Sequence, residues 1–182
     1  MKKFGLLICA AVIGMAFISC GSNKKVAQAP TKECQCMSTK DAFRAEGSFL
    51  AQYETMEPKA KQNAANRARQ ELASMMSATI ERVIDEYSNT EVVGDKQDFR
   101  ETTKELSRTI VKQVVKNSVP AIPGWSEKKE TGTMFFVCLE SNPNDLLEQV
   151  SQKISQNEKL RTDFEYEKFK ETFEKALESI DE

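Results

Sequence analysis

The stretch PKAKQNAANRARQELASMMSATIERVIDEYS, residues 58–88, decides the fold. Its apolar residues recur every four positions, which is the spacing of one face of an α-helix. These residues are Ala60, Ala64, Ala68, Leu72, Met76, Ile80 and Ile84. Pro58 suits a first helical turn, and no glycine or proline interrupts residues 59–88. The pattern predicts one long helix whose first half is small enough to approach a neighbour closely and whose second half is bulky.

Before this helix, residues 42–53 read AFRAEGSFLAQY and alternate with a period of two. A period of two is typical of a strand that buries one face. The residues expected on the buried face are Phe43, Ala45, Gly47, Phe49, Ala51 and Tyr53.

After the long helix, Asp95 or Asp98 is suited to cap a second helix, and Pro120 and Pro123 are expected to stop it. The apolar residues of this second helix are Phe99, Leu106, Ile110, Val111, Val114 and Val115. Next come GWSEKKET and TMFFVCLE, which read as an antiparallel hairpin around Thr131-Gly132. Because both faces of TMFFVCLE are apolar, we expect that strand to be central or covered on both sides.

Residues 141–182 are predicted to form two further helices, the first beginning at SNPND, residues 141–145. Their apolar stripes either pack within the chain or form a surface for a partner or a second copy. The stripes consist of Leu146, Leu147, Val150 and Ile154, then Phe169, Phe173, Leu177 and Ile180. The predicted fold class is α+β: a small antiparallel sheet of about three strands on long helices over residues 41–140, with a C-terminal helical appendage over 141–182.

The first 19 residues are typical of an export signal, because Lys2 and Lys3 precede a short apolar run, Phe4–Ile18. This run ends in Phe17-Ile18-Ser19-Cys20, which resembles the lipobox of bacterial lipoproteins. The resemblance implies that Cys20 is lipidated and becomes the N-terminus, and Gly21 after it favours the outer membrane. The alternative is an ordinary secreted protein with a chance cysteine. Residues 20–40 are polar and read as a flexible tether.

Composition excludes several function classes. The chain has no histidine, which rules out Ser-His and Cys-His nucleophile pairs and HExxH metal sites. Without Lys2 and Lys3, 24 basic side chains face 28 acidic ones, a balance that argues against nucleic acid as a partner. We therefore predict no enzymatic activity, no cofactor and no resident metal.

Three cysteines remain besides Cys20 in the mature chain. Cys34 and Cys36 could bind a soft metal, could be incidental residues of the tether, or could pair with Cys138 in a disulfide. Cys138 lies in an apolar strand and is expected to be buried. The sequence leaves the pairing open.

The segments EGSFLAQ, AKQNAANRARQELASMMSATIERVI and GWSEKKETGTMFFVCLE, with the lipobox before them, resemble the bacterial LPP-twenty lipoprotein family. The matching positions in the long helix are Ala64, Ala65, Ala68, Arg69, Leu72 and Ala73. The resemblance covers roughly residues 42–140. It implies a compact α+β domain on an envelope lipoprotein without established chemistry, and it carries no catalytic residue.

The sequence thus predicts a lipid-anchored envelope protein with a binding or scaffolding role. Its expected partners are the membrane, through the lipid on Cys20, and envelope proteins or a second copy, through the C-terminal helices. The alternatives are a small-ligand or metal carrier and a hydrolase of an envelope polymer, which would use paired carboxylates. Trp125, the only tryptophan, is a candidate contact residue if it is exposed, although such a residue can also simply cover a core edge.

Overall fold

The structure is a computed structural model that describes residues 36–91 and 93–180, so the predicted signal peptide, Cys20 and most of the tether lie outside the described residues. The elements are β1 (Phe43–Ala51), a 3-10 turn (Glu54–Met56), α2 (Glu57–Thr90), α3 (Lys96–Lys116), β2 (Val119–Pro120), β3 (Trp125–Lys129), β4 (Gly132–Ser141), α4 (Pro143–Gln156) and α5 (Tyr166–Glu178). The predicted α+β class is confirmed, with long helices beside a small antiparallel sheet.

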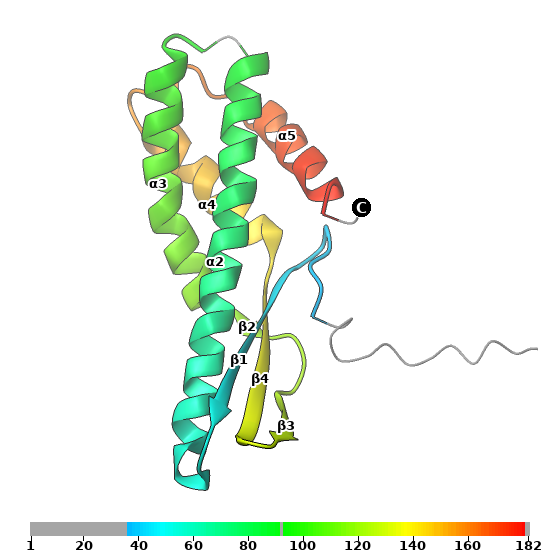
Figure 1. Cartoon of the computed structure of the whole chain (residues 1–182). Coiled ribbons are helices and arrows are strands. Elements are labelled where there is room, and N and C mark those ends of the chain that lie inside the picture. The colour runs from blue at the N-terminus through cyan, green and yellow to red at the C-terminus, as the bar shows by residue number, and fades with distance from the viewer. Residues whose placement is uncertain (1–35, 92, 181–182) are drawn as a thin grey trace, which may run out of the picture.

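Helix α2 runs the whole length of the molecule (Figure 1). Its 34 residues make it about 51 Å long at 1.5 Å per residue. The sheet packs along its N-terminal half, and α3 and α5 lie along its C-terminal half (Figure 1). The change from small to bulky residues along α2 therefore marks the change from strand neighbours to helix neighbours.

In the N-terminal half of α2, the sheet lies very close to the helix backbone. Ala60, Ala64 and Ala68 are fully buried there. A Cβ atom on Gly47 of β1 would lie 2.0 Å from the carbonyl oxygen of Ala64 and 2.3 Å from the amide nitrogen of Ala68. Only glycine fits at this point of β1, because any side chain would overlap the helix backbone.

In the C-terminal half of α2, bulky side chains form one continuous hydrophobic core with α3, α4 and α5. Both predicted stripes of the C-terminal helices contribute to this core, including Leu146 and Ile154 of α4 and Phe169 and Phe173 of α5. These apolar stripes therefore pack within the chain, as one of the two interpretations of the sequence expected. Residues 141–180 share their core with the residues before them.

One buried tyrosine fixes the loop between α4 and α5 to α2. The hydroxyl of Tyr87 donates to the carbonyl oxygen of Asp163 at 3.2 Å and accepts from the amide of Glu165 at 2.7 Å. The ring packs against Phe99 and Phe169, with centroids 5.7 and 5.4 Å away. Burial raises the pKa of Tyr87, and the hydrogen bond from the Glu165 amide offsets part of that rise.

The sheet has four strands where the sequence predicted about three. Strands β1, β2 and β3 all pair antiparallel with β4, which confirms that β4 is central. The additional strand is the two-residue β2, which the sequence does not reveal because Pro120 indicates a helix stop. Asp95 caps α3, because its side chain accepts from the amides of Gln97 and Asp98. Tyr53 was expected on the buried face of β1, but β1 ends at Ala51 and Tyr53 is 70% exposed.

Candidate functional site

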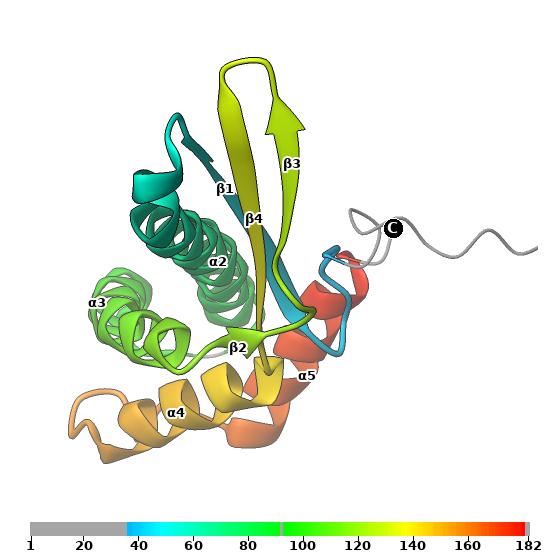
Figure 2. The ribbon, with the colours of Figure 1, turned by 90° about the horizontal axis from the view of Figure 1, so that it is seen from below.

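One face of the sheet packs on α2, and no helix of the described chain lies over the opposite face (Figure 2). We call this opposite side the outer face. The pairing Phe49↔Phe135 and the contact of Gly47 with α2 place the odd-numbered residues of β1 and β4 on the helix side. The outer face therefore carries Arg44, Glu46, Ser48 and Leu50 of β1, Met134, Phe136, Cys138 and Glu140 of β4, Val119 of β2, and Trp125 and Glu127 of β3.

An aromatic pair forms the most distinctive part of the outer face. Trp125 and Phe136 lie directly opposite each other on β3 and β4, and their rings stack with centroids 5.1 Å apart and planes 5° apart. Both side chains are partly exposed. Leu50 and Met134, also partly exposed, form the next cross-strand pair of the same face. Sequence reasoning named Trp125 as a candidate contact but missed Phe136, although the hairpin register places the two opposite each other.

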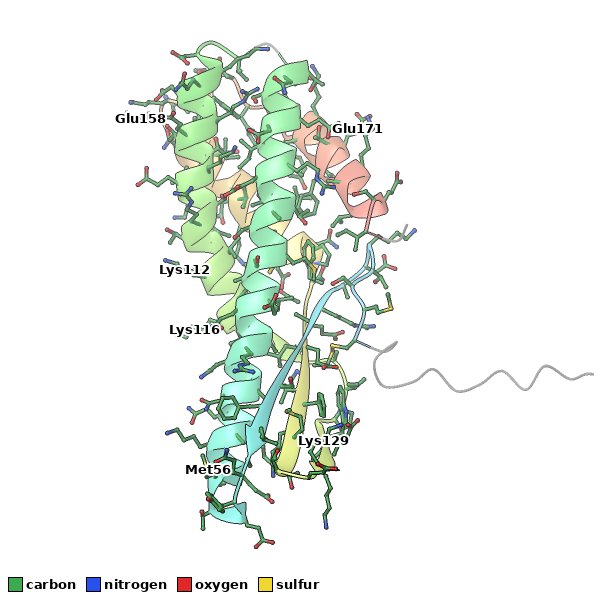
Figure 3. The ribbon with its side chains drawn as sticks, viewed as in Figure 1. Met56, Lys112, Lys116, Lys129, Glu158 and Glu171 are labelled. Atoms are coloured by element: carbon green, nitrogen blue, oxygen red, sulfur yellow. A yellow bond between two sulfur atoms is a disulfide. The ribbon has the colours of Figure 1, made fainter. Side chains whose placement is uncertain are left out.

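A disulfide covers the middle of the outer face. Cys36 is bonded to the fully buried Cys138, which answers the pairing question that the sequence left open (Figure 3). Ser38, two residues later, is held on β1: its hydroxyl accepts from the Arg44 amide and donates to the Arg44 carbonyl, both at 2.8 Å. Cys36 therefore lies on the outer face, and the chain passes from there to the free edge of β1, where the Ser38 hydroxyl also contacts the sulfur of Met75 on α2 at 2.9 Å. The Cys36 thiol is engaged, so it is not available to a metal site with Cys34.

The charged side chains of the outer face are largely paired. Arg44 and Glu140 form an ion pair with a 3.0 Å separation, and Glu127 pairs with Lys129 at 2.7 Å. Two large apolar side chains near the disulfide are well exposed: Met37, next to Cys36, is 64% exposed and Val119 is 54% exposed. The outer face thus combines exposed apolar groups with two ion pairs and one further carboxylate, Glu46.

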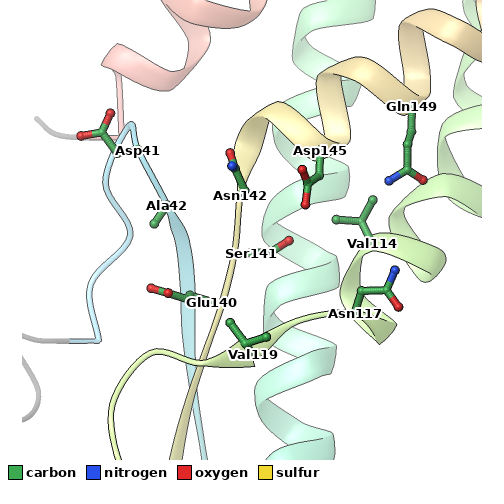
Figure 4. Close-up of a pocket in the computed structure, with 10 residues that line it drawn as sticks. All are labelled: Asp41, Ala42, Val114, Asn117, Val119, Glu140, Ser141, Asn142, Asp145 and Gln149. Carbon is green, nitrogen blue, oxygen red and sulfur yellow. The ribbon is translucent and has the colours of Figure 1, made fainter.

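A polar cleft of about 330 Å³ lies between the residues just before β1, the strands β2 and β4, and the helices α3 and α4 (Figure 4). It contains the carboxylates of Asp41, Glu140 and Asp145, which come from different segments and do not converge on one point (Figure 4). Glu140 is paired with Arg44, and Asn142 is the N-cap of α4, accepting from the amide of Asn144. Within residues 36–91 and 93–180, no cluster of three or more metal-ligating side chains is present. The cleft shows no arrangement for acid-base catalysis.

A second hollow, of about 570 Å³, lies between α4 and α5. It is lined by Leu147 and Ser151 of α4 and by Tyr166 and Lys170 of α5. Tyr166 is 44% exposed, whereas Ser151 is buried and its hydroxyl has no hydrogen-bond partner in the described structure. This groove is one part of the C-terminal helices that remains open to another molecule.

None of the helices in the described part of the chain is both long enough and apolar enough to cross a membrane. Comparison with known proteins found no matching family model, no similar curated protein and no similar solved structure.

Proposed function

We propose that this chain is a lipoprotein of the bacterial cell envelope, anchored in the outer membrane by lipid on Cys20. We propose further that it has a non-catalytic binding or scaffolding role. One observation supports the proposal beyond the lipobox: the disulfide fastens Cys36, the first residue that the structure describes, to the centre of the sheet. The 15 residues between Cys20 and Cys36 thus connect an attachment point to a fixed position on the domain.

The length of this connection determines how far the domain can stand from the bilayer. Fifteen residues reach at most about 50 Å when fully extended, so the domain must stay within that distance of the attachment point. Each buried CH₂ of an acyl chain contributes about 0.8 kcal/mol, so two or three chains on Cys20 hold the domain durably at the surface. No protein segment then needs to enter the bilayer.

The binding role is supported by the surfaces that the fold leaves open. The apolar stripes of α4 and α5 are buried in the core, so the groove between these helices is the surface through which they would bind an envelope protein or a second copy. The chain contains no histidine, and the carboxylates of the polar cleft do not converge, which favours a non-catalytic role. A metal carrier would need the Cys34–Cys36 thiol pair, and Cys36 is in the disulfide.

The anchor is tested by growing cells with a clickable fatty acid and purifying the tagged protein. We expect label on the wild type and none on Cys20→Ala, which should appear in the soluble envelope fraction. Label on Cys20→Ala, or a wild type without label that leaves the membrane with salt, would refute the lipoprotein assignment.

The binding role is tested by photo-cross-linking in living cells. Benzoylphenylalanine is introduced in place of Tyr166, which lines the groove, and in place of Lys112, an exposed residue of α3 that serves as the control. A reproducible product from position 166 that is absent from position 112 supports binding through the groove. A cross-link between two copies identifies self-association, and equal or absent products at both positions contradict the groove as the binding surface.

A further inference from the structure

We infer that the outer face of the sheet docks on the lipid surface, with the Trp125–Phe136 stack at the boundary between headgroups and acyl chains. This inference rests on the proposed lipid anchor and goes further, because it assigns the membrane-facing side of the domain. It gives the partly exposed aromatic pair and the exposed residues Met37 and Val119 a common role.

The first argument is the position at which the chain joins the fold. The disulfide holds Cys36 over Cys138, which belongs to the outer face, and the chain then continues to Ser38 at the free edge of β1. The chain from Cys20 is therefore fixed to the outer face at Cys36. Because the 15 residues that follow Cys20 lead to this face, the face lies nearer the proposed anchor than the opposite side of the molecule does. The anchor makes binding of this face to the bilayer an intramolecular step, so the effective concentration of the bilayer at the face is high.

The second argument is the chemistry of the face. Tryptophan is enriched at membrane interfaces because its ring is largely apolar and its N–H stays in the hydrated headgroup layer. Around Trp125 the face offers the apolar side chains of Phe136, Leu50 and Met134. In the ion pairs Arg44–Glu140 and Glu127–Lys129, the charge of each side chain is already compensated by its partner before the face contacts lipid.

The same pairing of charges identifies the type of contact. A face that binds lipid through lysine and arginine depends on anionic lipids and weakens as salt screens the attraction. The outer face instead carries two cations, Arg44 and Lys129, against three carboxylates, Glu46, Glu127 and Glu140, so it has no excess of positive charge. Its docking should therefore need no anionic lipid and should persist at high salt. A zwitterionic phosphatidylethanolamine–phosphatidylcholine bilayer is therefore the appropriate probe.

The test uses Trp125 as the reporter, since it is the only tryptophan of the chain. Full-length lipidated protein is reconstituted into zwitterionic vesicles with and without bromine on the acyl chains. We expect brominated vesicles to quench most of the Trp125 emission, aqueous iodide to quench little of it, and both results to hold in 0.1 and 1 M salt. Vesicle flotation, measured on the same samples, reports the anchor separately.

Paired variants test the face itself. Met37→Glu combined with Val119→Glu places two charges on exposed positions of the face, and Tyr166→Glu places one on the exposed side of α5. The first variant should float but lose the quenching by bromine, and the second should behave like the wild type. If the wild type floats but bromine does not quench Trp125, the docking is refuted and the anchor stands. This conclusion is the same whether iodide quenches the ring or a second copy of the chain shields it from iodide. A wild type that fails to float would overturn both.

Discussion

Replacing Gly47 by alanine is the sharpest test of how the sheet packs on α2. The added Cβ would lie 2.0 Å from the Ala64 carbonyl oxygen and 2.3 Å from the Ala68 amide nitrogen. Real Cβ contacts are essentially never shorter than 3.0 Å, so strand and helix must separate by about 1 Å. Both obstructing atoms belong to the helix backbone and cannot rotate away.

The expected loss of stability follows from two opposing terms. Overpacking of a close-packed site costs about 1–3 kcal/mol, and here the displaced strand also loosens Phe43 and Ala45 from the core. Gly→Ala elsewhere stabilises by about 0.4–1 kcal/mol, because the unfolded chain becomes less flexible. We expect Gly47→Ala to lower the free energy of unfolding by about 2 kcal/mol, measured by urea unfolding followed by circular dichroism.

Gly94→Ala is the matched control. Its Cβ would meet only the flexible carboxylate of Asp163, at 3.2 Å, so the change should stay within about 0.5 kcal/mol of the wild type. Shortening a neighbour, as in Gly47→Ala with Ala64→Gly, should not restore stability, because the obstructing atoms are backbone. A Gly47→Ala protein as stable as the Gly94→Ala protein would refute the close packing of β1 on α2.

The other predictions concern the disulfide, the buried tyrosine and the helix cap, each measured by urea unfolding. Cys36→Ser should cost about 2–4 kcal/mol because the bond closes a loop of 102 residues, and Cys34→Ser, the control, should be neutral. Tyr87→Phe should cost about 1–2 kcal/mol, because the Glu165 amide loses its acceptor. Since burial raises the pKa of Tyr87, wild-type stability should fall as pH rises above about 10, and the phenylalanine variant should lack that part of the fall. Asp95→Ala should cost about 1 kcal/mol and Asp98→Ala much less, because Asp95 alone caps α3; equal losses would contradict this assignment.

The helices were predictable because their apolar residues follow a period that only a helix satisfies. The four-residue spacing from Ala60 to Ile84 gives both the extent of α2 and its buried face. The small residues of its first half also predicted a close neighbour, which is β1. Local capping chemistry placed the start of α3 at one of two aspartates, and the structure selects Asp95.

The pairings between distant segments were not predictable from these patterns. Cys36 and Cys138 are 102 residues apart, and nothing local distinguishes Cys36 from Cys34 as the bonded thiol. Strand β2 consists of two residues, Val119 and Pro120, held by backbone bonds to β4. It is too short to show a period in the sequence. Which side of β4 would face α2 was equally undetermined, because Phe135 and Phe136 give both sides an aromatic residue.

The apolar character of both sides of β4 has two different physical origins, and this distinction is the strongest guide to function. The side that carries Phe135 is apolar because α2 covers it. On the outer side, the disulfide covers Cys138, but Phe136 keeps part of its surface exposed beside Trp125. A fold of this size does not need a second apolar face on its sheet for stability, since α2 and the other helices already enclose a continuous core. A partly exposed apolar cluster beside the disulfide of Cys36 is therefore best explained by contact with another surface, and with the proposed anchor on Cys20 that surface would be the bilayer.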